Sequence, residues 1–194
     1  MNVSINTVKL TRPLYDWEIA MAAPIFGHAL QFRQVRVHEF AAWPDQIDDI
    51  GRKLKKMDPR AADVHNAITL FNGCNFPVGL PLQQPALSDP EYYKTGWLMH
   101  ELTHSWQFQK MGIRYLFLAV QAQFREGANV YDFGGAKNLV AQRTQPGWKI
   151  FNFNLEQQAE IVKSYYLALD DLPRQQEMYD ACLPYIQDVQ ASAT

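Results

Sequence analysis

The stretch His100-Glu101-Leu102-Thr103-His104 constrains this chain more than any other part of its sequence. Residues four apart on an α-helix lie on one face, so a helix through this stretch points both imidazoles the same way. Two neutral imidazoles can share one zinc ion, which takes a third protein ligand and keeps a fourth position for water. Glu101 lies next to the first histidine, where its carboxylate can take a proton from that water. The alternative is a polar helix face that holds two histidines without a metal.

A third ligand must come from another part of the chain. The other histidines, His28, His38 and His65, all precede the motif. The extended motif HExxHxxGxxH is excluded, because Gln107 and Lys110 stand where it needs glycine and histidine. A carboxylate from a later segment is therefore the better candidate.

Two glutamates downstream of the motif are the best carboxylate candidates. Glu156 and Glu160 are four residues apart on a predicted helix, so they share a face beside its apolar stripe. Like charges at this spacing repel by a few tenths of a kcal/mol on a bare helix, and a cation offsets that repulsion. The pattern is explained if one glutamate binds the metal and the other accepts the N–H of a ligand histidine. A solvated acidic face is the alternative.

The remaining patterns predict an α+β chain dominated by helices, with a small sheet upstream of the motif helix. Strands are expected at residues 35–40 and 67–71, the second closed by Asn72-Gly73. Helices are expected at residues 11–24, 44–57, 88–112 with a break at Gly96, 115–124, 154–172 and 175–190 with a kink at Pro184, and a loop at 125–150. With no linker or repeat in view, residues 1–194 are expected to form one domain.

Composition excludes several classes of function. The net charge is −2, so a general nucleic-acid surface is not expected. The basic run Arg52-Lys53-Leu54-Lys55-Lys56 is better explained as a solvated helix face. No apolar stretch is long and unbroken enough to insert in a membrane, and the first residues do not resemble a signal peptide, which predicts synthesis for the cytoplasm. Cys74 and Cys182 are expected as separate free thiols, with one disulfide between them as the alternative.

Two segments resemble a known family. Residues 100–107 and 156–162 look like the two metal motifs of a small bacterial group of zinc metallopeptidases encoded near contractile-injection and Rhs-type toxin genes. Ile25-Phe26-Gly27 and Val35-Arg36-Val37-His38 also resemble that group, so the likeness spans residues 11–168. More broadly, the pattern is similar to the gluzincin class, a zincin-like fold whose third ligand is a glutamate opening an ExxxD or ExxxE turn.

This resemblance implies a set of roles. Zinc would be held by His100, His104 and Glu156, with Glu160 behind the ligands and Glu101 as the catalytic base. It implies a peptide or protein substrate, a partner in a secretion apparatus or an immunity protein, and export by a contractile rather than a classical route. The expected function is zinc-dependent peptide-bond hydrolysis. The alternatives are a metal-stabilised adaptor module of a secretion apparatus with vestigial activity, and a zinc amidase that acts on cell wall.

Two further residue groups bear on substrate binding. The strand at residues 67–71 is expected to pair with an extended substrate if it lies at a sheet edge. Tyr131 lies between the two metal motifs in the sequence and is a candidate donor to a developing oxyanion, with a purely structural aromatic as the alternative.

Overall fold

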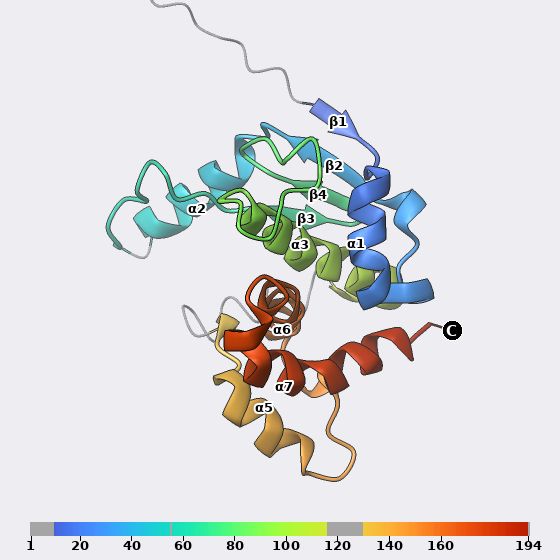
Figure 1. Ribbon diagram of the computed structural model, residues 1–194. Coiled ribbons are helices and arrows are strands. Elements are labelled where there is room, and N and C mark those ends of the chain that lie inside the picture. The colour runs from blue at the N-terminus through green and yellow to red at the C-terminus, as the bar shows by residue number, and fades with distance from the viewer. Residues whose placement is uncertain (1–9, 55, 116–129, 194) are drawn as a thin grey trace, which may run out of the picture.

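A small mixed sheet and a bundle of helices enclose the centre of the protein (Figure 1). The computed structural model describes residues 10–54, 56–115 and 130–193. The sheet has the strand order β1-β2-β4-β3. Its strands are β1 (Leu10–Arg12), β2 (Arg36–Glu39), β3 (Ile68–Leu70) and β4 (Gly73–Asn75). β2 and β4 run parallel, whereas β1 pairs antiparallel with β2 and β3 pairs antiparallel with β4.

Helices dominate the rest of the described chain, which confirms the α+β prediction. The helices are α1 (Asp16–Phe26), α2 (Trp43–Leu54), α3 (Tyr92–Met111), α5 (Gly135–Arg143), α6 (Leu155–Ala168) and α7 (Leu172–Gln190). Short 3₁₀ turns occupy Gly27–Ala29, Phe32–Gln34 and Ile150–Asn152. No helix in the described ranges is long and apolar enough to cross a membrane.

Helix α3, which carries the motif, lies between the sheet and α6 (Figure 1). One side of α3 packs against β3 and β4, and the other packs against α6, which in turn packs on α7. Buried side chains from all these layers form one core; its largest fully buried members include Phe76, Leu102, Trp106, Ile161 and Tyr185. The motif residues are therefore held in the middle of the protein rather than on a surface helix.

The predicted break at Gly96 is wrong, because α3 is continuous through this residue. A Cβ atom at position 96 would lie 2.6 Å from Leu167 Cδ2 of α6, so glycine serves here as a point of close helix contact. The helix also begins later than the predicted residue 88. α3 begins after Glu91, whose main-chain N–H donates to Asp89 Oδ1 at 2.8 Å.

Other boundaries differ where pairing or packing decides the structure. Residues 10–12 form β1 rather than the start of a helix, and residues 73–75 form β4, which was not predicted. Part of the predicted loop at 125–150 is helix α5. The last helix begins at Leu172, before the expected residue 175. The helix predicted at 115–124 lies almost wholly outside the described residues.

Helix α2 corresponds to the helix predicted at residues 44–57, but its apolar residues Ile47, Ile50 and Leu54 are exposed rather than packed on the core. Cys74 and Cys182 are both buried and free, as predicted.

Candidate metal centre

Three donor atoms from two helices converge at the centre of the protein. His100 and His104 lie one turn apart on α3, and Glu156 lies in the first turn of α6, whose start is fixed by a capping box at Asn154. The two Nε2 atoms are 3.1 Å apart, and Glu156 Oε2 lies 3.3 Å from His100 Nε2 and 3.2 Å from His104 Nε2. All three side chains are buried. The structure thus brings together three residues that the sequence placed in one site.

The spacing and chemistry of these donors fit a zinc ion. Zinc is bound tetrahedrally by imidazole nitrogen and carboxylate oxygen at about 2.0–2.2 Å, which sets neighbouring ligand atoms roughly 3.3–3.5 Å apart. The observed separations of 3.1–3.3 Å are close to that value. Among the described residues, these three form the one group of His, Cys, Asp and Glu whose donor atoms converge in this way. The site can therefore hold a metal ion.

Charge at this centre favours a cation. Burial opposes protonation of His100, but contacts with Glu156 and Glu160 outweigh it and raise the pKa of this imidazole to about 10. Burial also opposes charge on His104, whose pKa is nevertheless raised by the negative charge of Glu156. Burial likewise disfavours ionised Glu156, yet the two histidines lower the pKa of its carboxyl group. Negative charge on Glu156 therefore attracts positive charge to this point, and a metal ion must compete with protons for it.

Glu160 lies behind His100, one turn after Glu156 on α6. Its Oε1 is 3.0 Å from His100 Nδ1, although the two atoms lack the alignment of a well-formed hydrogen bond. Lys163 Nζ lies 3.1 Å from the same oxygen. Burial opposes ionisation of Glu160, but the His100 ring and Lys163 lower the pKa of its carboxyl group. Glu160 is therefore placed to touch a ligand from outside while Glu156 faces the centre.

Gln107 is a buried residue of the site that the sequence reasoning missed. His104 Nδ1 lies 2.8 Å from Gln107 Oε1, which accepts its N–H and leaves the Nε2 lone pair for a metal. The amide group of Gln107 donates to Leu155 O at 2.9 Å and to Gln158 Oε1 at 3.0 Å, both from α6. One side chain thus contacts His104 and joins the two helices that supply the three donors. Its position three residues after His104, on the same helix face, is the signal that could have found it.

Replacing Gln107 with leucine is expected to weaken zinc binding by about 10–100-fold, the usual effect of losing a partner of a ligand histidine. The change leaves the His104 N–H and the Leu155 carbonyl without their partner. A chelator-competition titration measures the affinity. Gln109→Leu is the matched control, because Gln109 bonds to Gln31 and Asn72 instead of to a ligand. Equal affinities for the two variants would contradict the role of Gln107.

Glu101 lies between the two histidines in sequence but points toward the sheet. Its carboxylate is buried and accepts a hydrogen bond from Thr69 Oγ1 of β3, Oγ1 to Oε2 2.7 Å. Glu101 does not belong to the group of converging donors, although its charge acts on both His100 and His104. Its carboxylate therefore lies beside the centre without being one of the three converging donors.

Two tyrosine rings flank the histidines. The Tyr131 ring centroid lies 6.3 Å from that of His100, and the Tyr115 ring centroid lies 5.8 Å from that of His104. Tyr115 is buried, whereas Tyr131 is partly exposed. Burial and the nearby charges of Glu156 and Glu101 raise the pKa of both hydroxyl groups, so both stay protonated and able to donate. Tyr131 thus lies near the centre, and its role toward an oxyanion stays a prediction.

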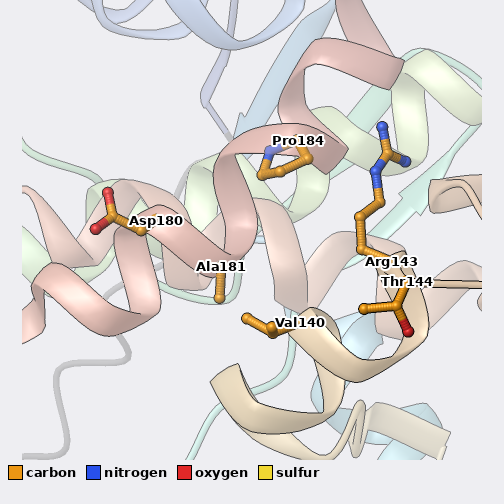
Figure 2. A pocket seen from close by; sticks show the side chains of 6 residues that line it. All are labelled: Val140, Arg143, Thr144, Asp180, Ala181 and Pro184. Atoms are coloured by element: carbon orange, nitrogen blue, oxygen red, sulfur yellow. The ribbon is translucent and has the colours of Figure 1, made fainter.

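A hollow of the surface lies elsewhere, between α5 and α7 (Figure 2). It is lined by Val140, Arg143, Thr144, Asp180, Ala181 and Pro184. The Arg143 guanidinium is already paired with Asp188, at 2.7 Å. The hollow shares no residue with the three donors and offers mainly apolar surface, so it adds nothing to the metal centre.

One comparison with known proteins gives a match. The chain is similar to the type VI secretion system spike protein VgrG2b of Pseudomonas aeruginosa, with 29% identity over 157 residues. The aligned region covers 80% of this chain and 13% of VgrG2b, so the chain corresponds to a small part of that protein. No family model matches the chain, and no solved structure matches it. The chain is thus similar in sequence to one region of a secretion-system spike protein.

Proposed function

We propose that this chain is a zinc-dependent metallopeptidase of the zincin-like, gluzincin type. The observation that carries the proposal is the convergence of His100 Nε2, His104 Nε2 and Glu156 Oε2 within 3.3 Å of one another. Glu101, a carboxylate that does not belong to this group, lies beside it. A purely structural zinc site usually has four protein ligands and needs no such base. Three donors with an adjacent base are the arrangement of a catalytic site.

In this proposal the ligands are His100, His104 and Glu156. Glu160 and Gln107 contact the Nδ1 atoms of the two histidine rings, on the side away from the metal. When bound by these residues, zinc would supply Lewis-acid chemistry, which can polarise a carbonyl and lower the pKa of a water to about 7. The Glu101 carboxylate takes a proton from the attacking water and later passes it to the leaving amine. Burial of Glu101 strengthens its electrostatic effect, because the surroundings screen its charge less than bulk water does.

The edge strand β3 is the candidate for binding an extended peptide. β3 is the last strand of the described sheet and packs beside α3. A two-residue turn joins Leu70 to Gly73, and in such a hairpin the closing pair exchanges both main-chain hydrogen bonds. The pairs alternate, so Thr69 opposite Cys74 directs its N–H and C=O away from β4, although the residue as a whole is buried. A substrate strand that paired with Thr69 would have to displace what covers it.

The similarity to VgrG2b supports an association of the proposed activity with a secretion system. The printed name of that relative describes a spike protein of a type VI secretion system. By analogy, we place this chain among domains that such a system carries, with export by that contractile route and with a peptide or protein as substrate. The adaptor alternative agrees equally well with this similarity. It does not explain, however, why the buried carboxylate of Glu101 lies beside the metal centre. A cell-wall amidase would use the same centre on a different substrate.

The test is zinc dependence of hydrolysis. Purified protein is expected to hold one zinc per chain by elemental analysis and to cleave members of a peptide library. Removal of the metal with a chelator should abolish cleavage, because no described residue replaces the lost Lewis acid, and added zinc should restore it. Cleavage of peptidoglycan fragments but not of peptides would favour the amidase. Stoichiometric zinc without cleavage of either would favour the adaptor module.

A further inference from the structure

We propose that Thr69 is a positioning residue that holds the Glu101 carboxylate in the orientation needed for proton transfer; this inference rests on the proposed function. The Thr69 hydroxyl donates to Glu101 Oε2 at 2.7 Å and lies 3.2 Å from the main-chain oxygen of the same residue. Thr69 is 3% exposed and Glu101 2%, so water does not compete with this contact. The shorter distance is that of a strong hydrogen bond to a charged acceptor.

Glu101 depends on this contact to an unusual degree. Within the part of the chain that the structure describes, no other side chain donates a hydrogen bond to Glu101, and no lysine or arginine pairs with it. A glutamate side chain has several rotatable bonds, and an ionised buried carboxylate seeks any donor within reach. The Thr69 hydroxyl therefore selects one orientation of the carboxylate. Without it, Glu101 is free to turn toward the histidines or toward whatever metal they hold.

The position of Thr69 also ties the base to the sheet. Its hydroxyl side faces α3, while its main-chain N–H and C=O are directed away from β4 on the outer side of β3. Proton transfer requires the base and the reacting atoms to lie within hydrogen-bond reach of each other. Thr69 contributes to this placement by holding the Glu101 carboxylate in one position relative to the sheet.

A neighbouring contact provides a control for the interface between the sheet and α3. One helical turn after Glu101, Ser105 Oγ lies 3.5 Å from Cys74 Sγ of β4. Both residues are fully buried, as is the interface around Thr69. Loss of the Ser105 hydroxyl therefore tests a polar contact between the same layers that does not touch the base.

The experiment compares Thr69→Val, Thr69→Ser and Ser105→Ala in the zinc-loaded protein. Valine keeps the shape of threonine but cannot donate, so Thr69→Val is expected to lower kcat by about 10–100-fold. KM and the zinc content should stay within about threefold of wild type, because the ligands and the backbone edge are unchanged. Thr69→Ser should recover most of the loss, and Ser105→Ala should leave kcat nearly unchanged.

Crystal structures of wild type and Thr69→Val provide a measurement that does not depend on activity. The carboxylate of Glu101 is expected to leave its wild-type orientation in the valine variant. An unmoved carboxylate, full kcat in Thr69→Val, or a serine variant as slow as the valine variant would overturn the inference. If wild-type protein cleaves no substrate, the proposed function fails, and the orientation of Glu101 in the two structures still decides the role of Thr69.

Discussion

Glu101→Gln is expected to bind zinc like the wild type and to lose peptide hydrolysis by about 10²–10⁴-fold, the usual contribution of a general base. The glutamine side chain has the size of glutamate and can still accept from Thr69, but it cannot take a proton. Glu101 is not among the converging donors, so zinc content should not change. The measurement is kcat/KM on a responsive peptide together with elemental analysis of the same samples.

A second glutamate serves as the control for this change. Glu91 precedes the first turn of α3 and pairs with Lys94 at the surface, at 2.6 Å. Glu91→Gln removes the same charge from the surface, away from the three donors, and should leave the rate unchanged. Equal rates for wild type and Glu101→Gln on that peptide would rule out the peptidase proposal.

The two glutamates of α6 should differ sharply in their effect on the metal. Glu160→Gln is expected to lower zinc affinity by about 10–100-fold, because Glu160 contacts a ligand ring from outside. Glu156→Gln should cost far more, since it replaces one of three donors with a neutral amide. A chelator-competition titration of both variants at one pH measures the order. Equal affinities would show that both carboxylates play one role, and the reverse order would make Glu160 the ligand.

The parts of the site that could be predicted are those with local signals. His100 and His104 share a helix face by spacing alone, and the cap at Asn154 fixes where α6 begins. The choice of Glu156 as the inward residue came from the resemblance to known peptidases, since spacing leaves the pair equivalent. The geometry agrees with that choice, because Glu156 Oε2 contacts both Nε2 atoms.

The parts that could not be predicted depend on contacts between distant segments. Thr69 is 32 residues from Glu101 in the sequence, and nothing in a short apolar strand indicates that its hydroxyl faces a base. Glycine often interrupts a helix, but Gly96 lies within α3. Leu167 approaches it so closely that a larger residue would not fit. Helix α5 was missed because consecutive glycines are typical of loops, although Gly134 is the N-cap of this helix and Gly135 is its first residue. Strands of three residues, such as β1 and β4, are defined by pairing rather than by any pattern.

The shortness of β3 has a consequence for affinity. Only Thr69 of its three residues directs both main-chain groups away from β4, and this residue is buried, so the edge offers a substrate at most two backbone hydrogen bonds, once Thr69 is uncovered. Two such bonds contribute about 1–3 kcal/mol, less than the roughly 4 kcal/mol that corresponds to millimolar binding. Backbone pairing also carries no sequence preference. A free peptide at micromolar concentration would therefore rarely occupy this edge, whereas a target held nearby by a tether experiences an effective concentration of about a millimolar. We expect delivery of this domain to the immediate neighbourhood of its target to determine what it cuts.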